Sequence, residues 1–201
     1  MTRCLVTDRR RLCPEARAFA AARACLVDQA RRAAAAGIEL IQIRERDLEA
    51  ADLAALVADV VAVTRESRTR VVVNDRLDVA LACRADGVHL RGDSYPVKDA
   101  RRLMPPPLLV GRSIHTLEDL ARADGADYVI AGTVFRSVSK PSALRAELIG
   151  LAGLHDIVNA SPMPVLAIGG ITPDRVDAVL ATGADGIAAI GLFIDSLKPA
   201  S

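Results

Sequence analysis

The amino-acid sequence predicts a small (β/α)8 barrel, with a short last helix, as a single domain over residues 1–201. Three observations predict this fold. Apolar residues make up 51% of the chain and aromatic residues only 2%, so the core must be built from the Ala, Val, Leu and Ile of buried parallel strands and their covering helices. One βα phrase recurs along the chain. Strand and helix patterns alternate eight times, as in a (β/α)8 barrel.

The recurring phrase is an Ala-rich helix end, then a Gly, then an apolar strand. It occurs as AAAAGIELIQI from residue 33, CRADGVHL from 83, ARADGADYVIAG from 121 and LATGADGIAAIG from 180. A Gly just past a helix supplies the left-handed C′ residue, and a short loop then leads into the next strand. A doubly wound open sheet is the alternative architecture.

The elements follow from apolar runs and helical stretches. Strands are predicted near residues 3–7, 38–43, 70–73, 86–90, 108–111, 126–131, 164–168 and 185–190. Helices are predicted at 22–36, 50–66, 116–124, 144–159 and 173–182, the last one starting at Thr172-Pro173. No composition break or long linker interrupts the chain, so one domain is expected.

Charge and hydropathy argue against two classes of partner. The 26 basic and 25 acidic residues give a formal net charge of +1, without the basic block that nucleic-acid binding needs. No apolar run approaches the roughly 18 residues of a membrane span, and MTRCLVTDRRRL lacks the apolar segment of a signal peptide. We therefore expect a cytoplasmic protein without nucleic-acid or membrane partners. Its cysteines, without metal-finger spacing or a CxxC pair, are expected to stay thiols, with Cys4 and Cys83 as small core residues.

Polar residues follow the predicted strands at their C-terminal ends, where barrels carry their chemistry. Strands two to six end at Arg44-Glu45-Arg46, Asn74-Asp75, His89, Ser113 with His115, and Thr133. Such groups are costly to bury, but at one open mouth water or an anionic ligand satisfies them. Other roles stay open for each group. Asn74 or Asp75 could cap the next helix, the histidines could pack, and the charged trio could form a salt-bridge cluster at the rim.

Glycine-rich strand ends predict a phosphate site in the last quarter of the chain. Gly169 and Gly170 follow strand seven, and Gly191 follows strand eight. Barrels bind phosphate there through backbone N–H groups, and a Cβ would block the anion. The loop GTVFRSVSKPS adds hydroxyls and an ammonium suited to phosphate oxygens, on Ser137, Ser139 and Lys140. A double Gly that only turns the chain is the alternative.

The order of the motifs resembles that of the thiamine phosphate synthase and TenI-like family. IRER, NDRLDVALACRADGVHL, GRSIHTLED, GADYVIAGTVF…SK, AIGGITPDR and GADGIAAI follow one another through nearly the whole chain. The resemblance implies the (β/α)8 fold and a bound thiazole phosphate. In the synthase branch it implies a transferase that joins this thiazole to a hydroxymethylpyrimidine pyrophosphate and releases pyrophosphate. The alternatives are a TenI-like thiazole tautomerase and a non-catalytic phosphate-binding regulatory barrel.

The resemblance also implies roles for single residues. Arg44, Asn74 and Lys140 would be the catalytic set, holding the pyrophosphate. Asp75 would bind Mg²⁺, with Asp93 as a candidate second carboxylate. Substrate contacts are implied for Gln42, Arg46, Ser113, Ser137, Ser139, Gly169, Gly170 and Gly191. The roles of His89 and His115 are left open, and so is the oligomeric state, with a homodimer as one option.

The sequence departs from both branches of the family. Synthases usually have REK where this chain has Arg44-Glu45-Arg46, and HLGQ followed by acidic residues where it has His89 to Ser94. Tautomerases carry a histidine in a GHVF segment where this chain has Thr133. The retained Asn74, Asp75 and Lys140 favour the synthase, because a tautomerase has no pyrophosphate for them to hold.

Overall fold

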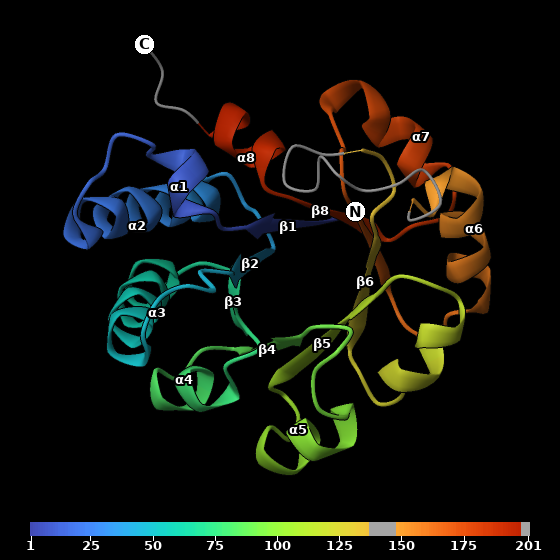
Figure 1. Cartoon of the computed structure of the whole chain (residues 1–201), viewed down its shortest axis with the longest axis horizontal. Coiled ribbons are helices and arrows are strands. Elements are labelled where there is room, and N and C mark those ends of the chain that lie inside the picture. The colour runs from blue at the N-terminus through green and yellow to red at the C-terminus, as the bar shows by residue number, and fades with distance from the viewer. Residues whose placement is uncertain (137–147, 198–201) are drawn as a thin grey trace. The chain divides into compact units, whose positions relative to one another are not determined.

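The computed structural model describes residues 1–136 and 148–197 and has a closed barrel of parallel strands (Figure 1). The strands follow one another around the barrel in chain order: β1 (Thr2–Val6), β2 (Leu40–Ile43), β3 (Arg70–Asn74), β4 (Gly87–Leu90), β5 (Leu109–Ile114), β6 (Tyr128–Gly132), β7 (Val165–Ile168) and β8 (Gly186–Ala189). The predicted (β/α)8 fold is therefore confirmed, and the open-sheet alternative is wrong because the sheet closes.

Helical segments alternate with the strands. They are α1 (Arg9–Leu12), α2 (Phe19–Ala35), α3 (Ala50–Thr64), α4 (Leu77–Ala82), α5 (Val97–Leu103), the 3₁₀ helix η1 (Glu118–Ala123), α6 (Gly150–Ala160), the 3₁₀ turn η3 (Pro173–Arg175), α7 (Val176–Leu180) and α8 (Gly191–Ser196). The predicted short last helix is α8, and the predicted helix over 173–182 is divided into η3 and α7. None of the described helices is long and apolar enough to cross a membrane.

The described chain divides into two compact units. One unit comprises Met1–Arg3 and His89–Ala189, and the other comprises Cys4–Val88 and Ile190–Ser201. In the second unit α2 packs along α3, outside the strands, as Figure 1 shows. The expectation of one domain stays a prediction.

Strand register decides which polar residues become neighbours. Ile43 of β2 pairs with Val73 of β3, so Arg44, which follows β2, and Asn74, the last residue of β3, lie side by side. All four residues of β2 are buried, which explains why its apolar residues, Leu40, Ile41 and Ile43, do not alternate with exposed polar ones.

Three of the four occurrences of the recurring phrase carry a second signal besides the Gly, an Asp just before the strand. Asp86 accepts a hydrogen bond from the backbone N–H of Val71 at 2.7 Å, and Asp185 accepts one from Val165 at 2.9 Å. Asp127 does the same for Val110 at 2.6 Å. Each of these three carboxylates thus ties the start of one strand to the strand before it, so these three βα units are joined in the same way.

Cys13 and Cys25 form a disulfide, so the expectation that every cysteine stays a thiol is wrong for this pair. Cys13 follows α1 and Cys25 lies in α2, so the bond ties these two helices together. Spacing rules for metal sites and CxxC pairs miss it, because the pairing depends on how the two helices pack. Cys4 is a buried free thiol, as expected, and burial raises its pKa to about 12. Cys83 is also free and only half-buried.

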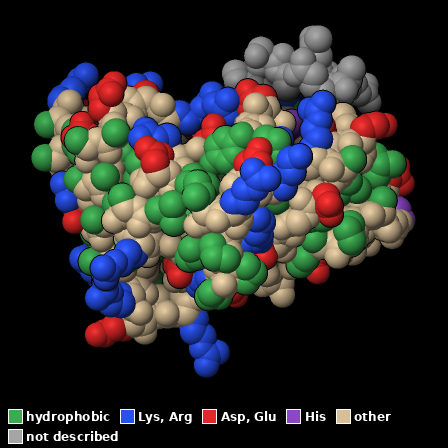
Figure 2. All heavy atoms as spheres, turned by 90° about the horizontal axis from the view of Figure 1, so that it is seen from below, with side chains coloured by type: hydrophobic (Ala, Val, Ile, Leu, Met, Phe, Trp, Pro, Cys, Tyr) green, Lys and Arg blue, Asp and Glu red, His purple; other side chains and the backbone are tan. Residues whose placement is uncertain are grey.

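The surface mixes both charge signs. On the face in Figure 2, basic and acidic side chains are interspersed among apolar and neutral ones. The near balance of 26 basic and 25 acidic residues in the sequence agrees with this mixture.

Candidate active site

The backbone at the end of β2, where two arginines follow one another closely, is held by Thr7, which follows β1. The Arg44 N–H donates to Thr7 Oγ1 at 2.9 Å, and the Thr7 N–H donates to the Gln42 carbonyl at 3.0 Å. Gln42 is buried, Arg44 is half-buried and Arg46 is exposed. The start of the segment after β2 is therefore fixed by a hydrogen bond from the Arg44 backbone to the Thr7 side chain, while the side chains of Arg44 and Arg46 differ in their access to solvent.

Glu45 is engaged by Arg9 at the start of α1. The Arg9 backbone N–H donates to Glu45 Oε1 at 3.1 Å, and Arg9 Nη1 donates to Oε2 at 2.8 Å. Burial raises the pKa of Glu45, although the Arg9 contacts oppose that shift. Glu45 therefore forms a salt bridge at the rim, as the alternative interpretation expected. Its partner is Arg9, which lies outside the Arg44-Glu45-Arg46 run.

Asp47 completes this connection between α1 and the segment after β2. Arg9 Nη1 donates to Asp47 Oδ1 at 2.7 Å, and Arg10 Nη2 donates to Oδ2 at 2.6 Å. The hydrogen bonds from Arg9 lower the pKa of Asp47 to about 2. One carboxylate therefore links two arginines of α1 to the loop that carries Arg46.

We expect this link to weaken in acid. A carboxylate whose pKa is lowered in the folded state contributes stability above its ordinary value of 3.8, and that stability is lost as the pH falls through about 2. The free energy of unfolding of Asp47→Asn should therefore differ most from that of the wild type near neutral pH. The two should converge as the pH approaches 2. Urea titrations at several pH values measure this, and a difference independent of pH contradicts it.

The end of β3 brings Asn74 and Asp75 to the same side as the end of β2. Asn74, Glu45 and Arg46 help to line a small cavity of about 70 Å³. Asp75 is half-buried and has a left-handed backbone, with φ 63°, a conformation that Asp and Asn adopt more readily than most residues. Helix α4 has Arg76 as its N-cap residue, so neither Asn74 nor Asp75 occupies the capping position that was the alternative for them.

In the other unit, His89 is the centre of a buried polar chain. Its Nε2 lies 2.9 Å from Ser113 Oγ, and its Nδ1 lies 3.2 Å from the Tyr128 hydroxyl. A Cβ on Gly111 would lie 2.6 Å from His89 Nδ1, so this Gly leaves the space that the chain occupies. His89 is only 1% exposed and both of its ring nitrogens have partners, which agrees with the alternative that this histidine is a packing residue. Its contact with Ser113 also fixes the position of the Ser113 hydroxyl.

The glycines after β7 lie against the segment after β6. Gly169 and Gly170 have φ of 108° and 62°. A Cβ on Gly169 would lie 2.4 Å from Thr133 Cγ2, and one on Gly170 would lie 2.3 Å from the Arg136 carbonyl oxygen. Tight packing and left-handed backbone therefore require both glycines, so their presence does not by itself distinguish a phosphate site from a turn. In the same region, His115 Nδ1 is hydrogen-bonded to the Gly132 carbonyl oxygen.

The candidate metal carboxylate Asp93 is exposed and paired. Arg91 donates to its two oxygens through Nε and Nη2, both at 2.9 Å. Within residues 1–136 and 148–197, no group of three His, Cys, Asp or Glu side chains could hold a metal ion. A metal held mainly by protein ligands is therefore not supported in that part of the chain.

Arg11 lies beside Gly191, a predicted substrate contact, and the sequence interpretation did not single it out. Its Nη2 would lie 2.9 Å from a Cβ on Gly191, so the guanidinium sits beside the first residue of α8. No carboxylate of the described ranges pairs with it. The feature of the sequence that could have identified Arg11 is its place in the basic run of residues 9–11, shortly after the first strand. The predicted residues Ser137, Ser139 and Lys140 lie outside the described residues.

Comparisons with known proteins agree over most of the chain. A family model described as thiamine monophosphate synthase matches residues 11–193. A thiamine-phosphate synthase of Methanoculleus marisnigri is 43% identical over 169 residues, 83% of this chain and 79% of the relative. One of Roseiflexus castenholzii is 39% identical over 197 residues, 97% of this chain and 82% of the relative. A solved thiamine phosphate pyrophosphorylase of Pyrococcus furiosus has a TM-score of 0.78 at 34% identity, covering 98% of this chain and 97% of that one.

Proposed function

The chain belongs to the thiamine monophosphate synthase family, and on that premise we propose that it couples a thiazole phosphate to hydroxymethylpyrimidine pyrophosphate. A bond forms between the thiazole nitrogen and the methylene carbon of the pyrimidine. The bond from that carbon to the pyrophosphate oxygen breaks, and pyrophosphate leaves with the electron pair. The observation that carries the proposal is the similarity to synthases over nearly the whole chain, including 39% identity across 97% of it.

The residues after β2 and β3 are the proposed pyrophosphate site. Arg44 and Asn74 follow paired residues of adjacent parallel strands, so a guanidinium and an amide start from neighbouring points. A guanidinium binds phosphate oxygens with charge-assisted hydrogen bonds, and it stabilises the charge that grows on the leaving group. Lys140 is proposed as a further cation on the basis of its sequence motif. Gln42 and Arg46 are proposed as substrate contacts from the same strand end.

Magnesium is proposed as the cofactor, with Asp75 as its protein ligand. Mg²⁺ in phosphate-transfer sites is usually held by one or two carboxylates, waters and the substrate phosphates, so a three-residue protein cluster is not required. Asp75 fits this mode, as a half-buried carboxylate directly after β3. Asp93 would first have to release Arg91. When bound, the ion would neutralise charge on the leaving pyrophosphate.

The thiazole phosphate is proposed to bind at Gly191, Gly169 and Gly170, together with Ser137 and Ser139. Support in the described structure is strongest at Gly191, where the Arg11 guanidinium lies next to a residue without a side chain. A cation and an unobstructed backbone N–H are the groups that bind a phosphoryl oxygen. Ser113, whose hydroxyl is fixed by His89, is proposed to contact the substrates.

Arg11→Gln is expected to raise the KM for the thiazole phosphate by about 10- to 100-fold, with a smaller change in kcat. A hydrogen bond to a charged group contributes about 1.5 to 3 kcal/mol, and each 1.4 kcal/mol is about tenfold in affinity. Steady-state kinetics with the thiazole phosphate varied measure the effect. The exposed Arg17 makes a matched control, because Arg17→Gln removes the same charge from the same N-terminal segment. Equal KM values for Arg11→Gln and Arg17→Gln would remove Arg11 from the site.

A product assay tests the function. The protein is incubated with both substrates and Mg²⁺, and thiamine phosphate is measured after oxidation to its fluorescent thiochrome form. The proposal requires product that depends on both substrates. Proton exchange on a thiazole carboxylate phosphate without coupled product would instead identify a tautomerase. Binding of the thiazole phosphate with neither activity would identify a regulatory barrel.

A further inference from the structure

We propose that Arg112 is a positioning residue that holds the loop between β4 and α5 over the end of β5. Arg112 lies in β5 and is only 3% exposed, which is unusual for a charged side chain. A buried guanidinium is costly unless its N–H groups are hydrogen-bonded. The hydrogen-bond partners of Arg112 therefore indicate the role of this side chain.

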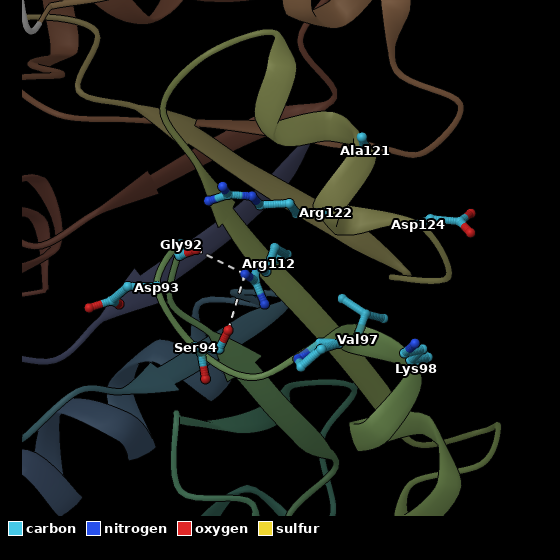
Figure 3. A pocket seen from close by; sticks show the side chains of 10 residues that line it. Gly92, Asp93, Ser94, Val97, Lys98, Arg112, Ala121, Arg122 and Asp124 are labelled. Carbon is cyan, nitrogen blue, oxygen red and sulfur yellow. Dashed lines mark hydrogen bonds between the residues drawn. The ribbon is translucent and has the colours of Figure 1, made fainter.

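The partners are backbone carbonyls of one short loop. Arg112 Nη1 donates to the Tyr95 carbonyl at 2.7 Å. Arg112 Nη2 donates to the Gly92 carbonyl at 2.9 Å and to the Ser94 carbonyl at 3.4 Å. Figure 3 shows the guanidinium directed at this loop, with two of these bonds as dashed lines. Because one planar, rigid group binds three carbonyls, the loop conformation depends on guanidinium geometry as well as on charge.

The loop lies against Ser113, a proposed substrate contact, and against His115. A Cβ on Gly92 would lie 3.5 Å from His115 Cδ2 and 3.6 Å from the Ser113 carbonyl oxygen. Side chains of successive strand residues point to opposite faces, so Arg112 points away from the face on which Ser113 meets His89. Arg112 therefore acts through the loop that carries Asp93, without touching the reacting atoms. This role in the reaction rests on the proposed function.

A pocket beside the guanidinium makes the proposal testable by chemical rescue. The pocket has a volume of about 490 Å³, and its lining includes Ser94, Lys98, Arg112 and Arg122. Lys98 and Arg122 are exposed, while Arg112 is buried at the pocket wall. Removing the Arg112 side chain would leave a space that is open to a small cation from solvent.

Arg112→Ala is expected to lower kcat/KM for coupling by about 10- to 100-fold, since a small misplacement of groups near the reaction can cost about 10²-fold. Guanidinium chloride at a few millimolar should restore much of this loss, because it supplies the planar donor set, while ammonium at the same concentration should not. Arg122→Ala is the matched control. It lines the same pocket and donates to no loop carbonyl of the described residues, so its activity should be near that of the wild type and should not respond to guanidinium.

Hydrogen exchange provides a readout that does not depend on activity. The Ser94 amide donates to the Arg91 carbonyl at 3.1 Å within the loop, so its exchange reports loop order. It should speed up by about tenfold or more in Arg112→Ala and slow again with guanidinium. If Arg112→Ala does not fold, Arg112→Lys, which keeps the charge without the planar fork, should fold and show the faster exchange.

The outcomes separate this proposal from the proposed function. Wild-type exchange at Ser94 in the variants, or faster exchange that guanidinium leaves unchanged in Arg112→Ala, would overturn the positioning role. Wild-type activity in a folded Arg112→Ala would overturn it as well. The wild-type protein could instead lack coupling activity while the loop still loosens in Arg112→Ala and is restored by guanidinium. That result would support the positioning role of Arg112 and refute the coupling reaction.

Discussion

Arg44→Met is expected to lower kcat/KM for thiamine phosphate formation by about 10²- to 10³-fold. Loss of a preorganised donor to developing negative charge costs about 2.7 to 4 kcal/mol in other enzymes, and 1.36 kcal/mol is about tenfold in rate. Met keeps much of the apolar length of the side chain, so the loss should come from the missing guanidinium. The Arg44 backbone N–H bond to Thr7 survives the substitution, so the segment after β2 should stay in place.

Arg68→Met is the matched control for this loss. Arg68 is exposed and precedes β3, so it lies at the opposite end of that strand from Asn74 and the variant has the same change of charge. Its activity should stay close to that of the wild type. Equal activities of the two variants would show that Arg44 contributes only net charge, and the pyrophosphate site would have to be sought elsewhere.

Asp75→Asn is expected to lower product formation by more than about 10³-fold while leaving affinity for the thiazole phosphate almost unchanged. A metal ligand that helps to neutralise a leaving pyrophosphate supplies several kcal/mol in the transition state, at 1.36 kcal/mol for each factor of ten. Asn tolerates the left-handed backbone found at this position, where φ is 63°, so the fold should be retained. Kinetics with varied Mg²⁺ and calorimetric titration with the thiazole phosphate measure the two effects.

Asp78→Asn is the control for this variant, because Asp78 is an exposed carboxylate three positions further along the chain that pairs with Arg76. It should keep normal Mg²⁺ dependence. Full metal-dependent activity in Asp75→Asn would remove the main support for magnesium at the end of β3.

Strands were predictable from the sequence because most of their residues are buried and apolar. The run predicted at 70–73 is β3, Arg70–Asn74, and the run at 164–168 contains β7, Val165–Ile168. The short segments were harder. Helix α1 has only 4 residues and α5 only 7, too few for a helical period to stand out.

The contacts around the candidate site could not be predicted from the sequence, since they join positions far apart in the chain. Glu45 accepts from Arg9, 36 positions earlier, and the Arg112 side chain binds carbonyls 17 to 20 positions earlier. Local patterns identify a strand end as polar but not which partner it meets. The same limit explains the missed Cys13–Cys25 disulfide, which depends on how α1 and α2 pack.

The most direct measurement of the central claim is a ³¹P NMR time course of the protein with both phosphorylated substrates and Mg²⁺. Inorganic pyrophosphate and thiamine phosphate should form at equal rates and in equal molar amounts, so the pyrophosphate resonance, with two phosphorus atoms per molecule, should grow twice as fast as that of thiamine phosphate. Neither should form when the thiazole phosphate is omitted. Pyrophosphate that accumulates without thiamine phosphate, or a spectrum that does not change while the thiazole exchanges its proton, would contradict the coupling reaction.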